Sequence, residues 1–308
     1  MISYIIPVFD EEESLGAFYK ELKSVADSLS QSYEIIFIDD GSCDKTLEHL
    51  LDLEKKDSKV GVFSFRRNHG KAEALTFGFQ KAKGDLIVTL DADLQDKPTE
   101  IKKLLDKQKE GFDVVSGWRK KRKDSFAKII FSKSFNFVAR VLWGIRLHDY
   151  NCGLKIYTKD VAKELNLYGG MHRFIPLLAS DAGFRVTEVA VEHDVRRYGV
   201  SKYSAWKVLT QMPDMMSMFF LSKFGKRPLH LFGFVGLFLF IAGFLVSLYL
   251  SIEWFLGVPI GGRPLFFLGI LLILVGIQIS LTGLVADLIL NVANRNQSGT
   301  VVLKYPKE

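Results

Sequence analysis

The sequence is short of cysteine. It has two, Cys43 and Cys152, in 308 residues, which is too few for a framework of disulfides, so we expect reduced thiols that pack as small apolar side chains. No internal repeat or low-complexity tract occurs. The first seven residues lack a basic leader and a cleavage site and have the pattern of a strand. We therefore expect no signal peptide ahead of the folded part.

Charge is missing from two long segments, 229–252 and 265–286. At about 1.5 Å rise per residue, each is long enough to cross a hydrocarbon core of about 30 Å. We expect two transmembrane helices, with two buried core helices as the alternative. Lys223, Lys226 and Arg227 flank the first segment and Arg295 follows the second, whereas the loop at 253–264 has only Arg263. This distribution predicts that both ends of the chain are cytoplasmic.

The net charge is +6, but the excess is local. Seven basic residues face a single acid, Asp124, in one short stretch: Arg119, Lys120, Lys121, Arg122, Lys123, Lys128 and Lys133. Next to membrane spans, such a cluster favours anionic lipid head groups over nucleic acid. Apolar residues interleave with basic ones at 125–145, and 206–224 is rich in Met and Phe. Both segments predict helices lying in the membrane interface, although the first could be an ordinary core-facing helix.

Strand-like runs at 3–8, 34–38, 60–64 and 86–90 alternate with helix-like segments at 12–30, 45–56 and 71–83. This rhythm predicts an α/β fold with a mostly parallel sheet and helices on its faces. In such sheets, ligands bind beyond the carboxyl ends of the strands. Acidic residues fall at three of those ends: Asp10, Glu11, Asp39, Asp40, Asp91 and Asp93. We expect them to converge on one crevice.

The segment 90–96 holds three carboxylates within six residues, at Asp91, Asp93 and Asp96. Carboxylates this close repel one another unless a cation lies between them, and alternate positions of an extended segment place Asp91, Asp93 and Gln95 on one side. Hard oxygen ligands of this kind suit Mg²⁺ or Mn²⁺ bridging a diphosphate. For a motif this short, a solvated acidic turn is the alternative.

Four motifs follow one another in a specific order: Pro7-Val8-Phe9-Asp10-Glu11-Glu12, Asp39-Asp40-Gly41-Ser42, Asn68-His69-Gly70-Lys71 and Asp91-Ala92-Asp93-Leu94-Gln95-Asp96. This set resembles the family 2 glycosyltransferases of the GT-A fold. Later motifs are similar to the polyprenyl-phosphate branch of that family: Ser116-Gly117-Trp118-Arg119, Asp149-Tyr150-Asn151-Cys152-Gly153-Leu154-Lys155, His172-Arg173-Phe174-Ile175-Pro176 and Arg197-Tyr198-Gly199-Val200-Ser201-Lys202-Tyr203. The resemblance covers essentially the whole chain. It departs at Phe9, Asp10, Cys43 and Lys97, where Tyr, Asn, Thr and Pro are commoner.

The resemblance implies a Rossmann-like GT-A domain in the cytosol with interfacial helices and two C-terminal transmembrane helices. It also implies site residues. The nucleotide sugar would be bound by Pro7, Asp10, Glu11, Asp39, Asp40, Lys71 and Asp91, and Mg²⁺ or Mn²⁺ by Asp91, Asp93 and Gln95. The lipid phosphate would be bound by Arg119, Lys133, Arg197, Ser201 and Lys202, with Asp93, Arg119 and Arg197 catalytic.

The reaction expected from the resemblance is transfer of one hexose, with inversion, from a nucleotide sugar to polyprenyl phosphate. A phosphate acceptor is already anionic near neutral pH, so it needs no general base. What it needs is relief of repulsion from the anionic donor, and arginine forks bind phosphate well. The segments 152–155 and 172–176 look most like those of relatives that use UDP-glucose. GDP-mannose and UDP-N-acetylglucosamine stay open as donors.

The expected organisation is a GT-A domain at 1–203, an amphipathic juxtamembrane segment at 204–228, a two-helix transmembrane region at 229–290 and a cytoplasmic tail at 291–308. We expect an integral protein of a bacterial inner membrane. Glycines at 233, 236, 269 and 276 suggest self-association of the spans. Two spans are too few to carry a sugar across a bilayer, so a separate flippase and a downstream glycosyltransferase are expected partners.

Two other functions would fit part of this pattern. A processive polysaccharide synthase also joins this fold to membrane spans, but such enzymes resemble one another in a Q-x-x-R-W motif that does not occur here. A non-catalytic membrane scaffold with a degenerate transferase fold would have lost its metal ligands, whereas Asp91, Asp93 and Gln95 are present. The transferase is therefore the favoured prediction.

Overall fold

The computed structural model describes residues 1–29, 31–120, 140, 144–145, 147–194, 216, 219–220, 223–225 and 227–295. The chain divides into two compact units, Met1–Met218 and Phe219–Glu308. The predicted interfacial segments at 125–145 and 206–224 lie almost entirely outside the described residues. Four predicted lipid-phosphate residues do so as well: Lys133, Arg197, Ser201 and Lys202.

The first unit opens with alternating strands and helices. These are β1 (Ile2–Val8), α1 (Glu12–Ser28), β2 (Tyr33–Asp39), α2 (Thr46–Lys56), β3 (Val60–Ser64), α3 (Lys71–Lys81) and β4 (Leu86–Thr89). The observed bounds agree with the predicted ones to within two residues at each end. The apolar strand runs and the helix periodicity both depend on burial against the same sheet, which is why the sequence locates them well.

The second half of this unit is less regular. It contains the 3₁₀ turn η1 (Pro98–Glu100), α4 (Ile101–Gln108), β5 (Val114–Arg119), β6 (Lys155–Thr158), α6 (Lys159–Glu164), the 3₁₀ turn η2 (Met171–Arg173), α7 (Ile175–Asp181) and β7 (Val186–Val191). All seven strands form one sheet in the order β3-β2-β1-β4-β6-β5-β7. Strand β6 runs antiparallel to both of its neighbours, β4 and β5, and the other pairings are parallel. The sheet is therefore mostly parallel, as predicted.

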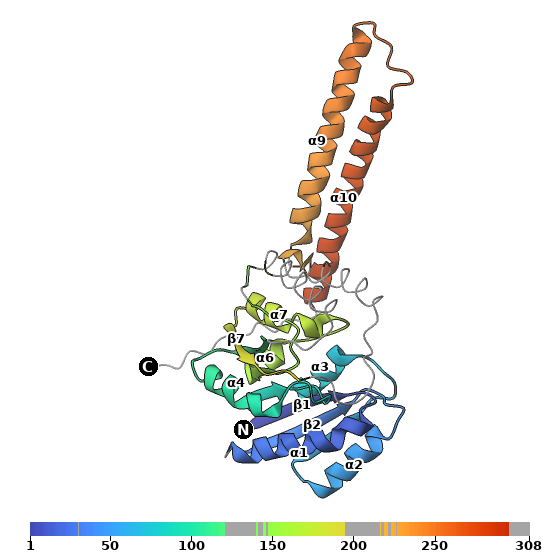
Figure 1. Cartoon of the computed structure of the whole chain (residues 1–308). Coiled ribbons are helices and arrows are strands. Elements are labelled where there is room, and N and C mark those ends of the chain that lie inside the picture. Colours follow the sequence, from blue (N-terminus) through green and yellow to red (C-terminus); the bar gives the residue numbers. More distant parts are fainter. Residues whose placement is uncertain are drawn as a thin grey trace. The chain divides into compact units, whose positions relative to one another are not determined.

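Helices cover both faces of the sheet (Figure 1). Helix α1 packs beside α2 and η1 on one face, while α3 contacts α6 and η2 on the other. Alternate residues of β1 show the division: Tyr4 and Ile6 join the core under α1 with Phe18. On the opposite face, a Cβ built at Gly78 of α3 would lie 2.4 Å from Cγ2 of Ile5. This close approach lets α3 lie flat on the sheet, so its first residue, Lys71, is fixed at the strands' carboxyl ends.

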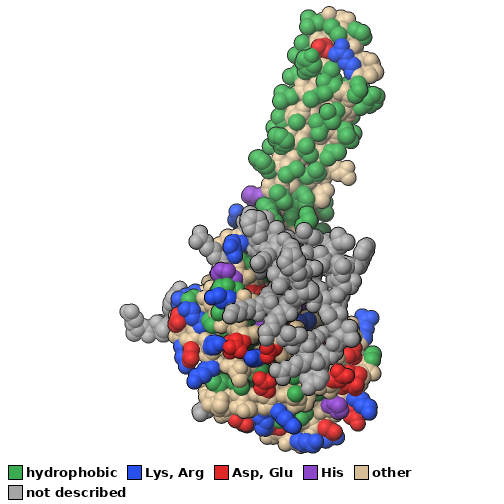
Figure 2. All heavy atoms as spheres, viewed as in Figure 1, with side chains coloured by type: hydrophobic (Ala, Val, Ile, Leu, Met, Phe, Trp, Pro, Cys, Tyr) green, Lys and Arg blue, Asp and Glu red, His purple; other side chains and the backbone are tan. Residues whose placement is uncertain are grey.

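The second unit contains two long apolar helices, α9 (Pro228–Phe255) and α10 (Pro264–Arg295), which pack along each other. The stretches Pro228–Phe255 and Pro264–Leu290 are long and apolar enough to cross a membrane, with mean hydropathy 2.5 each. Figure 2 shows hydrophobic side chains along the whole visible length of this hairpin above the grey atoms. Charge gathers at its loop, where Arg263 pairs with Glu253 and the Tyr249 hydroxyl donates to Glu253 at 2.6 Å.

Glycines at heptad spacing form the seam between these helices. A Cβ at Gly236 would lie 2.5 Å from the carbonyl oxygen of Gly276, and one at Gly243 would lie 2.6 Å from that of Gly269. Heptad spacing keeps the small residues on the side that faces the partner helix. Three of the four glycines that suggested self-association therefore pack within the hairpin itself. Gly233 differs, since its Cβ would meet only Leu229 of its own helix, at 3.7 Å.

Candidate active site

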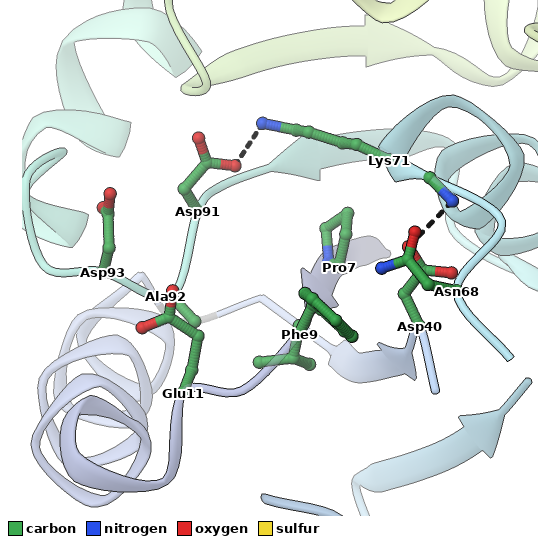
Figure 3. A pocket seen from close by; sticks show the side chains of 11 residues that line it. Pro7, Phe9, Glu11, Asp40, Asn68, Lys71, Asp91, Ala92 and Asp93 are labelled. Carbon is green, nitrogen blue, oxygen red and sulfur yellow. Dashed lines mark hydrogen bonds and ion pairs between the residues drawn. The ribbon is translucent and has the colours of Figure 1, made fainter. Parts of the chain in front are cut away.

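A cavity of about 280 Å³ opens at the carboxyl ends of β1, β2 and β4. Figure 3 shows its walls, which come from four separate loops. The lining residues are Pro7, Val8, Phe9, Glu11, Asp40, Asn68, Gly70, Lys71, Asp91, Ala92 and Asp93. The convergence predicted for the ends of β1, β2 and β4 is therefore found for Glu11, Asp40, Asp91 and Asp93, and the loop after β3 joins it. Six of the predicted nucleotide-sugar or metal residues line this one cavity: Pro7, Glu11, Asp40, Lys71, Asp91 and Asp93.

Asp10 does not line the cavity. Its backbone lies in the left-handed region, at φ 50°. Its Oδ1 accepts a hydrogen bond from the backbone N–H of Cys43 at 2.9 Å, and its own N–H donates to Ser42 Oγ at 3.0 Å. The side chain thus fastens the loop after β1 to the loop after β2. Asp10 was predicted to contact the nucleotide, but its carboxylate instead stabilises a loop that forms the cavity wall.

The neighbouring acids of β2 have different tasks. Asp39 is buried and accepts hydrogen bonds from Ser42 N at 3.1 Å and from Ser64 Oγ at 2.7 Å. Asp40 is also buried, and its two oxygens accept the N–H groups of His69 and Gly70 at 2.7 and 2.8 Å. Burial raises the pKa of Asp40, and these backbone bonds counteract part of that effect. Asp40 therefore holds the loop that leads directly into Lys71.

Gly41 makes this arrangement possible. Its φ is +73°, and a Cβ on it would lie 2.6 Å from the carbonyl carbon of Arg67. Any other residue would both strain the backbone and push the 66–70 loop away from Asp40. Gly41 thus combines a tight turn with the close approach of a second backbone segment.

Lys71 and Asp91 form an ion pair across the cavity (Figure 3). Burial alone would raise the pKa of Asp91, but the charge and hydrogen bond of Lys71, helped by Lys155, bring it below its usual value. Lys155 lies in the interior behind Asp91 with its ammonium on the carbonyl of Cys152, and burial lowers the pKa of Lys155 to about 8. His172 is nearby and neutral, because burial and Lys71 keep its pKa well below the ordinary value.

Residues 91–96 alternate as the sequence predicts. Asp91, Asp93 and Gln95 are partly exposed, while Ala92, Leu94 and Asp96 are buried. Leu94 has φ 58°, an unusual value for a residue with a side chain. The turn is held by Asp93 Oδ1, which accepts Gln95 N–H at 3.1 Å. Gln95 is not among the residues that line the cavity.

The donor set at this turn fits a shared metal rather than a caged one. Within the described ranges, no group of three or more His, Cys, Asp and Glu side chains could hold a metal ion. Asp91 and Asp93 nevertheless present two carboxylates to the cavity. Mg²⁺ and Mn²⁺ are commonly held by one or two carboxylates while phosphates and water complete the shell. The residues present therefore suit a metal bound together with a diphosphate.

Asp96 and Cys152 lie behind the turn. The Asp96 carboxylate accepts the backbone N–H of Leu154 at 3.1 Å, and the Cys152 thiol lies 3.8 Å from it. A Cβ at Gly153 would lie only 2.7 Å from Asp91 Oδ2, so this segment supports the acidic turn directly. Both cysteines are free, as predicted, but only Cys152 is packed in the interior, since Cys43 is exposed; burial raises the pKa of Cys152, which favours the thiol. Its function here is packing.

Arg119, the last residue of β5, is engaged by a partner that the sequence did not single out. Its Nε and Nη2 donate to the two oxygens of Asp149 at 2.7 and 3.0 Å, and both side chains are largely buried. The Asp149 charge raises the pKa of Arg119 although burial alone would lower it. Asp149 is held in turn by Glu188 of β7, whose Oε2 accepts the N–H groups of His148 and Asp149 at 2.8 and 3.3 Å.

This bidentate pair is what sequence reasoning missed. Asp149 stands in a family motif, but it is 30 positions away from Arg119 in the sequence, and nothing in the sequence shows that the two side chains meet. The available signal was that Arg119 and Asp149 each stand in a motif of the family that the sequence resembles. Arg119 is not among the residues lining the cavity.

Comparison with known proteins identifies the family. The model of Glycosyl transferase family 2 matches residues 3–165. The dodecaprenyl-phosphate galacturonate synthase of Rhizobium johnstonii is 36% identical over 94% of this chain and 87% of its own length. The undecaprenyl-phosphate 4-deoxy-4-formamido-L-arabinose transferase of Pseudomonas aeruginosa is 33% identical over 93% of this chain and 84% of its own length.

A solved structure extends the comparison to the fold. Glucosyl-3-phosphoglycerate synthase from Mycobacterium tuberculosis, crystallised with Mn²⁺ and UDP-glucose, has a TM-score of 0.55. It is 20% identical in sequence, and the match covers 73% of this chain and 79% of that one. At that identity the likeness speaks for the fold alone, and it confirms the predicted GT-A architecture. The chain belongs to glycosyltransferase family 2 and is a glycosyltransferase, similar over almost its whole length to polyprenyl-phosphate sugar transferases.

Proposed function

We propose that this glycosyltransferase transfers a single sugar from a nucleotide sugar to a polyprenyl phosphate. The observation that carries the proposal is the cavity at the strand ends, where Lys71 faces the carboxylates of Asp91 and Asp93. Two apolar helices in the same chain suit a lipid substrate. The relatives named for dodecaprenyl and undecaprenyl phosphate cover more than nine-tenths of the chain.

The nucleotide sugar would bind in this cavity. We assign Pro7, Glu11 and Asp40 to the nucleotide, because they line the cavity from β1, from the loop after it and from the loop after β2 (Figure 3). Carboxylates accept hydrogen bonds from base N–H and ribose hydroxyl groups. Asp39 and Asp10 would support the nucleotide site indirectly, since their oxygens already accept hydrogen bonds from the surrounding loops. Lys71 would direct its charge at the diphosphate.

Asp91 and Asp93, with Gln95 beside them, would hold Mg²⁺ or Mn²⁺ on that diphosphate. Such an ion, when bound, supplies positive charge that offsets the charge of the departing nucleoside diphosphate. The chain's own residues contribute in two ways. Asp93 keeps the turn in shape by accepting Gln95 N–H, and Lys71 keeps the side chain of Asp91 directed into the cavity.

The acceptor would attack without a general base. An oxygen of the lipid phosphate forms a bond to C1 of the sugar while the bond from C1 to the diphosphate oxygen breaks, and the electron pair leaves with the nucleoside diphosphate. No proton has to move in this step. Direct displacement inverts the anomeric centre and gives a β-linked product from an α-linked donor. The remaining task is to hold two anions together.

Basic residues would offset that repulsion. We assign the acceptor phosphate to Arg119, whose guanidinium Asp149 holds in place. Arg197, Ser201, Lys202 and Lys133 are assigned to the same phosphate from the sequence. Arginine suits this task because its planar fork has five donors, so the two used by Asp149 leave others for a phosphate.

The identity of the sugar is the finer part of the proposal. The motifs at 152–155 and 172–176 favour UDP-glucose, with GDP-mannose and UDP-N-acetylglucosamine as further donors. The curated relatives are named for galacturonate and for 4-deoxy-4-formamido-L-arabinose. The donors to be tested therefore include UDP-galacturonate as well as the neutral hexoses.

We further propose an integral membrane protein with its GT-A domain and both termini in the cytoplasm. Arg227 precedes α9 and Arg295 ends α10, whereas the loop between them has one basic residue, Arg263, already paired with Glu253. A lipid-linked sugar made on that side needs a flippase and a transferase on the other side. Self-association of the hairpin would have to use a surface other than the seam of Gly236, Gly243, Gly269 and Gly276.

The test is a donor panel with purified protein, a short-chain polyprenyl phosphate and Mg²⁺ or Mn²⁺, with the lipid product read by mass. We expect one sugar per lipid from one donor. Asp93→Ala should lower turnover on the order of 100-fold or more, whereas Asp106→Ala, an exposed acid paired with Lys109, should not. A product carrying several sugars, or no lipid product from any donor, would overturn the proposal. Near-normal turnover of Asp93→Ala would refute the role of Asp93.

A further inference from the structure

The acidic turn at 91–96 is fastened at its far end to the end of β7. Gln95 O accepts the backbone N–H of Asp194 at 2.9 Å, and Asp96 forms a β-bridge with His193. Lys97 adds charge to this junction. Its Nζ lies 2.8 Å from Glu192 Oε2 and 3.5 Å from Asp194 Oδ2. Backbone and side chains thus tie two segments together that are almost a hundred positions apart in the sequence.

The same end of β7 lies against the strand that carries Arg119. In the sheet register, Val191 pairs with Arg119, and Glu192 follows directly. Strand β7 is at the edge of the described sheet, with β5 as its neighbour there. An edge strand has ladder hydrogen bonds on one side, so other contacts must fix its end. The junction with Lys97 provides such contacts one residue beyond the Arg119 pairing.

The backbone of Leu94 makes the turn between Asp93 and Asp96 stiff. Its left-handed backbone is unfavourable for a residue with a Cβ and persists only where neighbours hold it. On one side it is held by Asp93 and Gln95, and on the other by the anchors of Asp96. A ligand that shifts Asp91 and Asp93 would therefore strain the turn or move the junction with it.

We propose that Lys97, together with Glu192 and Asp194, is a positioning clamp that couples the donor loop to the strand end of Arg119. The coupling of donor and acceptor rests on the function proposed above. Binding of donor at Asp91 and Asp93 then sets the position of Arg119, and binding of acceptor sets the turn.

The first measurement needs no acceptor. Full-length protein in detergent is compared with and without UDP and Mn²⁺, with GDP alongside, by hydrogen exchange of the peptide that contains residues 192–194. In the wild type, nucleotide should slow exchange there as well as at the turn. Lys97→Met should keep the slowing at the turn and reduce it at 192–194, where the backbone contacts of His193 and Asp194 remain, and Lys97→Arg should retain both. Equal slowing at 192–194 in Lys97→Met and wild type would overturn the clamp.

The second measurement adds the acceptor. The affinity for UDP with Mn²⁺ is measured by calorimetry with and without a short-chain polyprenyl phosphate, and the ratio is the coupling factor. In Lys97→Met, the effect of the acceptor on UDP affinity should be about two- to fivefold smaller than in the wild type, as expected for the loss of a partly exposed ion pair. Lys109→Met is the matched control, because Lys109 pairs with Asp106 on α4 and has no link to the turn. An unchanged ratio in Lys97→Met would count against the clamp.

The two proposals fail differently. If nucleotide slows exchange at residues 192–194 more in the wild type than in Lys97→Met, but no donor gives a lipid product, the clamp stands and the proposed function is wrong. If the wild type makes the lipid product while Lys97→Met behaves as the wild type in both measurements, the function stands and the clamp is wrong. The thermal unfolding of Lys97→Met should match the wild type, since Lys97 and Glu192 are both partly exposed.

Discussion

Arg119 and Asp149 form a buried pair, and this decides how the role of the arginine can be tested. Removing either partner of a buried ion pair leaves the other uncompensated, at a cost of about 3–5 kcal/mol. Arg119→Ala would therefore lower both stability and activity, and the two effects would be hard to separate. Asp149→Asn is the sharper change, because it keeps the shape of the side chain and removes its charge.

We expect Asp149→Asn to raise the KM for polyprenyl phosphate about tenfold while the KM for the nucleotide sugar changes little. The introduced amide would have one accepting oxygen in place of two, so it can accept only one of the two guanidinium N–H groups that Arg119 donates to Asp149, and the guanidinium is no longer fixed in its plane. Steady-state kinetics with each substrate varied in turn make the measurement.

Asp113→Asn is the control for this prediction. Asp113 precedes the same strand and its Oδ2 accepts Arg185 N–H at 2.8 Å, so the change tests the loss of a structural carboxylate at the other end of β5. If Asp149→Asn only lowered the melting temperature and left both KM values unchanged, Asp149 would be structural and Arg119 would not bind the acceptor.

At the same scale, the sequence located some cavity residues better than others, and their roles stay predictions. Asp91, Asp93 and Lys71 line the cavity, and the sequence could locate them because each follows a strand or begins a helix whose position is set by burial. Asp10 was expected at the nucleotide but faces Cys43 and Ser42. The reason is its left-handed backbone, which turns the side chain toward the neighbouring loop. A local backbone state of this kind depends on contacts that a single sequence does not display.

Among the elements, the first four strands could be predicted because each alternates with a helix over a short distance. The position of β6 between β4 and β5, antiparallel to both, could not. Its pairing joins residues such as Val88 and Ile156 across a long stretch of chain. The four residues of β6 do not by themselves determine which strands lie beside them, because strand pairing depends on the whole sheet.

The packing of α9 on α10 can be tested at a glycine of their seam. Gly276→Leu should destabilise the packing of α9 on α10 by about 1–3 kcal/mol, the usual range for overpacking. A Cβ at Gly276 would lie 2.6 Å from both Gly236 O and Phe240 N, so the helices must separate. Thermal unfolding in detergent, followed by the helical circular dichroism signal, measures the change.

Gly233→Leu is the matched control, because it adds the same side chain to a helix glycine whose Cβ would meet only Leu229 of α9. It should unfold like the wild type, or slightly later, as glycine weakens helices. Equal destabilisation by both substitutions would mean that the seam is not formed by Gly236 and Gly276 as described.

The whole molecule joins a charged sheet domain to a hairpin with exposed apolar side chains along its length. Residues such as Phe234, Phe238 and Leu271 are more than half exposed. A protein with an apolar surface along a whole helical hairpin would aggregate in water, so this surface requires lipid or another apolar cover. At about 1.5 Å per residue, the 28 residues of α9 exceed a hydrocarbon core of about 30 Å. The hairpin is long enough for its loop to emerge on the far side.

The native cysteines allow that orientation to be tested with little change to the chain. Cys43 is exposed on the GT-A domain and Cys152 is buried. A membrane-impermeant maleimide added to intact spheroplasts should therefore leave the wild type unlabelled, and Cys43 should react only after lysis. Val258→Cys introduces a thiol in the loop between α9 and α10 and should react in intact spheroplasts. Labelling of the wild type before lysis would place the catalytic domain outside the cytoplasm, where nucleotide sugars are scarce, and would reverse the orientation argued from Arg227 and Arg295.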